Sequence, residues 1–239
     1  MSLQTIEFII GSITLLFAYI FSVMLVGRAE AEIATLAGDD TPRDAGFLSW
    51  DPMVFVDLPG FICVMLLGMG WGRPLPFNPH NITGKHKLLS VFLVYMAQPV
   101  ISLLLVFVSL LATALIIGQR ALVLVQNGLL ESAQGKIFHK LSHNYQHISP
   151  LLLVCVTLLL ALATFNSFNA VWTFINNGFH YFLFIGHERN HDYMKHAEAL
   201  TFFGPLVVLI IYFGLLRYVL LKYLILAASI VATLLGASL

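Results

Sequence analysis

"GWGRPLPFNPHN", residues 70–81, is the stretch of sequence that decides the fold. It contains three prolines and two glycines, so it cannot continue a regular helix. A residue that precedes a proline is also restricted to extended backbone. Apolar runs lie on both sides of the stretch, at 53–71 and 88–118. We therefore predict a short strand-like loop at 70–81 between two membrane segments.

The composition indicates an integral membrane protein. The chain is 59% hydrophobic and 10% charged, whereas about a quarter of the residues in a soluble domain are charged. Such a chain cannot cover itself with polar surface, so the lipid bilayer is its expected surroundings. The formal net charge is zero, with twelve basic and twelve acidic residues. This balance argues against nucleic acid as a partner.

The apolar runs predict a single all-α transmembrane domain that covers residues 1–239. A membrane-spanning helix needs about 20 apolar residues. The run at 150–186 is too long for one span and carries several asparagines, so we expect a break inside it. This gives a multi-pass protein with five or six membrane segments. The expected spans are roughly 6–26, 53–71, 88–118, 150–168, 170–186 and 199–235.

The motif His187-Glu188-Arg189-Asn190-His191 matches HExxH, the signature of zinc peptidases. On a helix, His187 and His191 share one face and could hold one metal ion, while Glu188 could take a proton from a bound water. Glu198 could be a third ligand, although it would lie along the same helix as the pair. The alternative interpretations are a charged interfacial segment between two spans, and metal binding without proteolysis.

A second histidine cluster lies in "KIFHKLSHNYQH", where His139, His143 and His147 are each four residues apart. On a helix they would form a stripe on one side. Together with HERNH they are similar to the histidine boxes of membrane di-iron oxidases, although no HxxHH occurs. The alternative is a polar surface helix that contacts lipid headgroups or a partner.

Five stretches resemble the site-2 protease family of intramembrane zinc metalloproteases, in its compact bacterial branch. They are "LAGDDTPRDAGFLSWDP" (36–52), "VDLPG" (56–60), the Gly-Trp loop at 70–81, "MAQPVIS" (96–102) and "FINNGFHYF" (174–182). The resemblance implies an all-α polytopic domain of the site-2 protease type in a bacterial inner membrane. It also implies that the Gly-Trp loop lies beside the active site and binds a peptide or partner. The residues of the loop that we expect to do so are Trp71, Arg73, Pro74, Pro76 and Asn78.

The zinc motifs of that family are absent from their usual positions. The family places HExxH on the helix before the Gly-Asp-x-Thr turn, with its first His twelve residues ahead of the turn glycine. Counting back from Gly38 gives Val26-Gly27-Arg28-Ala29-Glu30, so Glu30 replaces the second His and neither His is present. The Leu-Asp-Gly turn that supplies the third ligand is also missing. One carboxylate, Glu30, cannot assemble a tetrahedral zinc site alone. The resemblance thus makes Glu30 and Asp57 remnant-site positions, with Asp57 expected to support the fold near the site.

The leading interpretation is a catalytically inactive member of that family. It would act as a binding or scaffold subunit of a membrane protein complex, together with other membrane subunits and without a cofactor. The alternative is an active membrane metalloenzyme. In that case zinc would be held at His187, Glu188 and His191 for proteolysis, or a metal would be held by the histidine boxes in an oxidase-like site.

Overall fold

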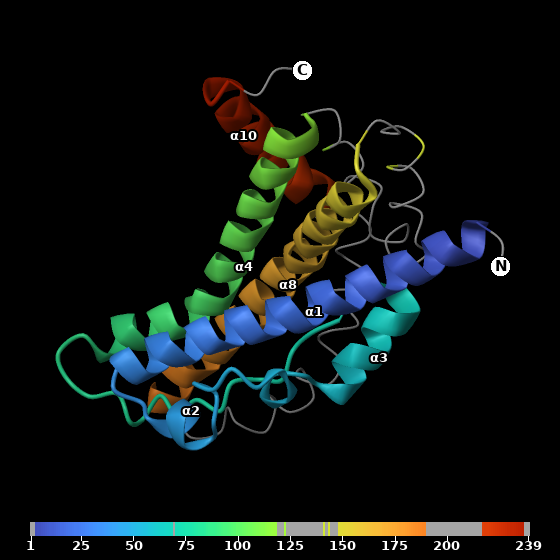
Figure 1. Ribbon diagram of the computed structural model, residues 1–239. Coiled ribbons are helices and arrows are strands. Elements are labelled where there is room, and N and C mark those ends of the chain that lie inside the picture. The colour runs from blue at the N-terminus through green and yellow to red at the C-terminus, as the bar shows by residue number, and fades with distance from the viewer. Residues whose placement is uncertain are drawn as a thin grey trace.

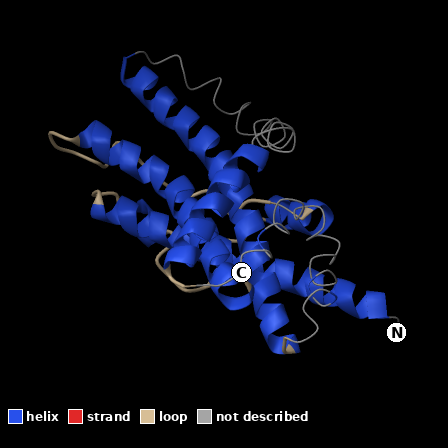
Figure 2. Cartoon of the chain, turned by 90° about the horizontal axis from the view of Figure 1, so that it is seen from above, coloured by secondary structure: helices blue, strands red, loops and turns tan. Residues whose placement is uncertain are grey.

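The computed structural model describes residues 3–68, 70–118, 122, 141, 143, 148–189 and 217–236. Every named element in these ranges is helical, which confirms the predicted all-α class (Figures 1 and 2). The elements are α1 (Leu3–Leu36), α2 (Thr41–Asp44), the 3₁₀ helix η1 (Pro52–Val54), α3 (Leu58–Leu67), α4 (Lys87–Ile117), α8 (Pro150–Arg189) and α10 (Arg217–Leu234).

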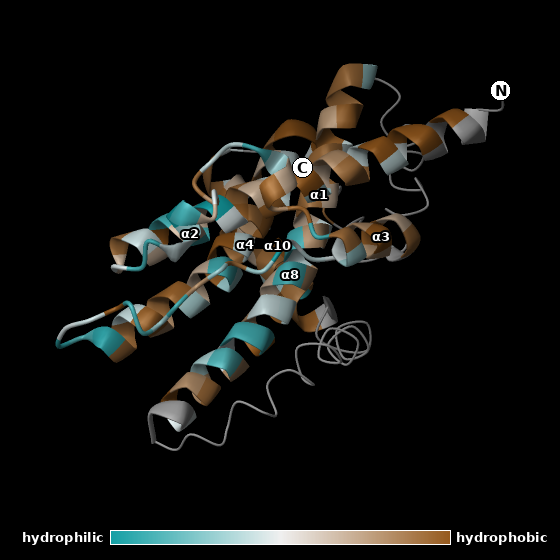
Figure 3. Ribbon diagram, turned by 90° about the horizontal axis from the view of Figure 1, so that it is seen from below, coloured by the Kyte–Doolittle hydropathy of each residue, from teal (hydrophilic) through white to brown (hydrophobic). Residues whose placement is uncertain are grey.

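Three of these helices are long and apolar enough to cross a membrane. They are Ile9–Leu36 within α1, Lys87–Ile117 and Pro150–Gly186 within α8. Figure 3 shows hydrophobic colour along most of α1 and α4. The first two helices correspond to the membrane segments expected near 6–26 and 88–118. Within the expected span at 199–235, the structure describes the shorter apolar helix Val219–Leu234.

Helix α8 is continuous where two segments were expected at 150–168 and 170–186. Its polar side chains bond to carbonyls of their own helix: the Asn166 amide donates to Leu162 O at 2.9 Å and the Thr173 hydroxyl to Asn169 O at 2.6 Å. These side-chain donors therefore find acceptors within α8 without interrupting the helix. With 40 residues α8 is about 60 Å long, twice the ~30 Å of a hydrocarbon core, so it must tilt or extend beyond the core.

The expected span at 53–71 is not one long helix. Helix α3 has ten residues, about 15 Å, which is too short to cross the bilayer. Asp57 is its N-cap and accepts a hydrogen bond from the Gly60 N–H at 3.0 Å. The helix ends at Gly68, whose φ of 75° terminates it in the left-handed conformation. Asp57 thus has a local structural role at the start of α3.

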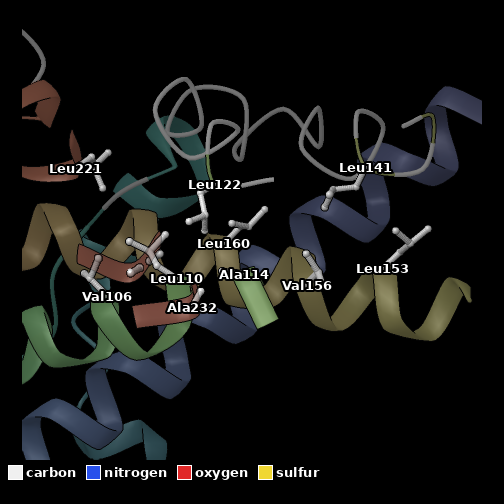
Figure 4. Packing of buried hydrophobic residues seen from close by; sticks show 12 residues of the cluster. Val106, Leu110, Ala114, Leu122, Leu141, Leu153, Val156, Leu160, Leu221 and Ala232 are labelled. Atoms are coloured by element: carbon white, nitrogen blue, oxygen red, sulfur yellow. The ribbon is translucent and has the colours of Figure 1, made fainter. Parts of the chain in front are cut away.

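The core is formed where α1, α4 and α8 pack together, with α10 against α4 (Figure 1). Figure 4 shows one buried cluster, to which α4 contributes Val106 and Leu110 and α8 contributes Val156 and Leu160. Alanines with almost no exposed surface let these helices approach closely. They are Ala114, Ala163, Ala228 and Ala232.

Candidate functional site

Buried Asp39 joins the turn after α1 to the end of the Gly-Trp loop. Its Oδ1 accepts from the Thr41 hydroxyl and from the Asn81 amide, each at 2.6 Å. Its Oδ2 accepts from the Asn78 N–H at 2.8 Å. The carboxylate is 0% exposed, so its hydrogen bonds are shielded from water. Asp39 therefore holds both ends of segment 39–81 together, at the end of the core where α1 finishes and α4 begins.

The far end of segment 39–81 is held by close backbone contact between α3 and the Gly-Trp loop. A Cβ on Gly60 would lie 2.1 Å from Trp71 O, and a Cβ on Gly70 would lie 2.1 Å from Gly60 O. No side chain larger than hydrogen fits at either position. These two glycines therefore determine how the loop sits against the first turn of α3.

One antiparallel bridge, between Val56 and Gly72, forms the strand-like part of the loop. Next to it the Arg73 N–H donates to Phe55 O at 2.7 Å. The Tyr19 hydroxyl lies 3.2 Å from Trp71 O, and Tyr19 stands well inside the apolar span Ile9–Leu36. Segment 39–81 therefore enters the protein beside α1, reaches the depth of Tyr19 and returns to the end where it began.

The residues expected to bind a partner divide into two groups. Arg73 and Pro74 are exposed on the loop, and Pro76 is half-buried. Trp71 packs against Trp172 of α8, with ring centroids 6.4 Å apart, so it anchors the loop. Asn78 also has a structural role, since its amide donates to Asn81 Oδ1 at 3.1 Å and its N–H bonds to Asp39.

Asp57 takes part in capping a helix rather than in an ion pair with another described residue. Among the described residues, the ion pairs join Arg28 to Glu32 at 3.0 Å and Arg43 to Asp40 at 2.8 Å, and Asp57 has none. The Asp57 carboxylate instead caps α3. Sequence reasoning missed Asp39, although the Gly-Asp-x-Thr pattern, in which an Asp side chain bonds to the backbone two residues on, is a signal for such a turn.

Val26 and Glu30, two of the positions where the resemblance would place HExxH, face the core of the protein. Val26 is 4% and Glu30 6% exposed. A Cβ on Gly27 would lie 2.7 Å from Phe55 Cδ1, so the backbone of α1 is in contact with the phenylalanine ring there. Zinc takes nitrogen, sulfur or carboxylate ligands, and these positions offer one carboxylate. No group of three His, Cys, Asp or Glu able to hold a metal ion occurs within the described ranges. The residues at these positions do not fit zinc.

The HERNH motif begins in the last turn of α8, which continues through Gly186 to Arg189. The first three residues of the motif therefore belong to α8, which does not break before them. His191 and Glu198 lie outside the described residues, as do His139 and His147. His143 is described as an exposed helical residue. A metal site at either histidine cluster stays a prediction.

The stability of the fold should depend on pH through Asp39. Burial raises the pKa of this carboxyl, but hydrogen bonds from Thr41, Asn78 and Asn81 outweigh burial and hold the pKa below its ordinary value of 3.8. A lowered folded-state pKa stabilises the protein above the unfolded-state pKa, and this contribution is lost as the pH falls through the folded value. We expect the melting temperature of the wild type to fall more steeply below about pH 4 than that of Asp39→Asn. Parallel curves would contradict this role.

Comparison with known proteins gives one partial match. No family model and no solved structure matches the chain. The chain is 36% identical over 94 residues to "Putative zinc metalloprotease YwhC" of Bacillus subtilis (strain 168). The match covers 39% of this chain and 42% of that protein. This similarity supports a protease-like family for the matched part of the chain.

Proposed function

We propose that the protein is a catalytically inactive, site-2-protease-like membrane protein that acts as a binding subunit of a membrane protein complex. One observation carries the proposal: the Gly-Trp loop is held in place by the bond from Asn78 to Asp39 and by the close contact with Gly60, while the positions where the resemblance would place the zinc motif hold Val26, Gly27 and Glu30. A working protease would need zinc ligands at these positions as well as the attached loop. A firmly attached Gly-Trp loop beside positions that lack zinc ligands fits a protein that binds a partner and does not cleave it.

The Gly-Trp loop offers a backbone edge to which a partner peptide could add. Pro74 and Pro76 hold Arg73 and Leu75 in extended conformations and donate nothing themselves. Of the backbone hydrogen bonds among described residues, none uses the N–H of Leu75 or Phe77. Along an extended chain these two groups point to the same edge. A partner segment that pairs with them would extend the Val56–Gly72 bridge by strand addition.

A photo-crosslinking amino acid at position 73 tests this use of the loop. The full-length protein would be irradiated in native membranes, beside a control with the same group at Val108, which is 57% exposed on α4. We expect a discrete adduct of one partner protein from position 73 and none of that mass from position 108. Equal labelling from both positions, or cleavage of the captured partner, would contradict the proposal.

The alternative function is an active zinc metalloprotease, which the HERNH motif favours. Under our proposal, His187→Ala and Glu188→Ala leave the position-73 adduct and the amount of the protein in the membrane unchanged. Under the alternative, either change abolishes activity and alters how long the partner stays bound. The yield of the adduct in each variant, compared with wild type by quantitative immunoblot, separates the two functions. A loss of adduct in both variants would favour the enzyme.

A further inference from the structure

Pro99 interrupts the backbone hydrogen bonds of α4. In an α-helix each carbonyl accepts a hydrogen bond from the N–H four residues later, so the donor for Tyr95 O would be residue 99. Proline has no N–H and therefore leaves this carbonyl without its usual partner. A backbone carbonyl inside a membrane protein is costly unless another group donates to it. At this point α4 therefore needs a donor from elsewhere in the protein.

Asn177 of α8 supplies that donor. Its side-chain amide donates to Tyr95 O at 2.9 Å and lies 3.4 Å from Gln98 Oε1, so one amide serves two acceptors in the turn before Pro99. An asparagine amide carries two N–H groups, which matches two acceptors. Asn177 is 8% exposed, so water has little access to these bonds. The side chain thus replaces, from a neighbouring helix, the backbone bond that Pro99 removes.

The part of α4 before Pro99, Lys87–Gln98, is held by one face of α8. Asn177 and Tyr181 are four residues apart, so their side chains lie on the same face of that helix. The Tyr181 hydroxyl donates to Leu88 O at 3.3 Å, and its ring lies 5.2 Å from that of Phe92. The bond to Leu88 is exposed, whereas Asn177 is buried. The bond from Asn177 is therefore the one that is shielded from water.

The same part of α4 contacts the edge of the Gly-Trp loop. The ring of Phe77 meets the ring of Tyr95 edge-on, with centroids 5.3 Å apart and planes at 88°. Tyr95 is also the residue whose carbonyl accepts the bond from Asn177. The N–H of Phe77 is one of the two groups to which a partner strand would bond. The bond that compensates for Pro99 and the edge of the loop therefore meet at one residue.

We propose that Asn177 is a positioning residue for partner binding. By donating to Tyr95 O it fixes the shape of α4 at Pro99, and it thereby holds Phe77 where a partner strand can pair with the loop. Without the amide, Tyr95 O has no donor, and the part of α4 before the proline can turn about it. The use of the loop rests on the proposed function, whereas the bond between Asn177 and α4 does not.

A double-mutant cycle between Asn177 and Pro99 tests the bond itself. Asn177→Leu removes the donor and should lower the melting temperature in detergent by about 5 °C. Pro99→Ala restores a backbone N–H to Tyr95 O, so in that background Asn177→Leu should lower it by about 1 °C at most. Asn166→Leu is the matched control, because Asn166 is a buried asparagine of α8 that bonds to Ser22 of α1 instead. Its effect should be the same in both backgrounds.

The cycle also decides the question if a variant folds poorly. If Asn177→Leu gives no monodisperse protein but Asn177→Leu/Pro99→Ala does, this rescue supports the proposal. The proposal is overturned if Asn177→Leu lowers the melting temperature equally in both backgrounds. It is also overturned if the double variant fails to fold as the single variant does.

The photo-crosslink from position 73 tests the positioning role separately. At a temperature well below the melting of each variant, Asn177→Leu should lower the yield of the adduct by about tenfold, because the loop is no longer preorganised. Asn166→Leu, which also removes a buried bond, should leave the yield unchanged. An unchanged yield in folded Asn177→Leu would overturn the positioning role. Absence of the adduct in the wild type would overturn the proposed function and the positioning role together, while the cycle alone decides whether Asn177 holds α4.

Discussion

Replacing Asp39 with alanine is expected to lower the free energy of unfolding by about 3–5 kcal/mol. The carboxylate accepts hydrogen bonds from the Thr41 hydroxyl, the Asn78 N–H and the Asn81 amide, and it is fully buried. Without it these donors lose a charged acceptor, and the two ends of segment 39–81 are no longer held together. Thermal unfolding in detergent measures the loss, and the fraction of monodisperse protein reports whether the chain still folds.

Asp40→Ala is the matched control for this prediction. Asp40 is the next residue in the chain, and its side chain is 62% exposed and paired with Arg43 across the surface. Exposed ion pairs contribute little, so the change should stay within about 0.5 kcal/mol. If the two alanine variants melt at the same temperature, Asp39 does not hold the segment in the way described.

Gly60→Ala should destabilise the protein by about 3 kcal/mol and displace the Gly-Trp loop. The added Cβ would lie 2.1 Å from Trp71 O, a backbone atom that cannot turn away as a flexible side chain could. Either α3 or the loop must move. The change should therefore also remove the crosslink from position 73. A variant that is less stable but keeps the loop in place would still form the crosslink at temperatures below its unfolding temperature.

The control for Gly60 is Gly178→Ala. Gly178 lies inside α8, and a Cβ added there has nothing within 4 Å. Alanine is the better helix former by up to about 1 kcal/mol, so this variant should be as stable as the wild type or more stable, with the crosslink intact. A Gly60→Ala protein that melts and crosslinks like Gly178→Ala would show that the close backbone contact is not required.

The sequence predicted membrane segments well where apolar runs stand alone. The run at 88–118 corresponds to α4, Lys87–Ile117, because its length and composition fit one membrane-spanning helix. The run at 150–186 was divided on account of its asparagines. In the structure the Asn166 amide N–H groups donate to Leu162 O and to Ser22 Oγ, so its own helix and a neighbouring helix accept its hydrogen bonds without a break in α8. Hydrophobicity alone does not reveal such partners.

The candidate site was predicted in outline, since the Gly-Trp loop could be identified from its prolines and glycines. Its attachment could not be, because Asp39 and Asn81 are 42 positions apart and only the folded chain brings them together. Asp57 was predicted to be a remnant-site position, and the structure adds that it is the N-cap of a ten-residue helix. A carboxylate before Leu-Pro-Gly is an ordinary start of a helix. This local sequence pattern, rather than the apolar residues around Asp57, indicates its structural role.

Metal content per chain tests the central claim most directly. The full-length protein would be purified in mild detergent without a histidine tag and analysed by elemental mass spectrometry, beside the double variant His187→Ala/His191→Ala. If the protein is an inactive binding subunit, we expect no stoichiometric zinc or iron in either protein. About one zinc or iron per wild-type chain, lost in the double variant, would show that HERNH is a working metal site and would contradict the account of an inactive binding subunit.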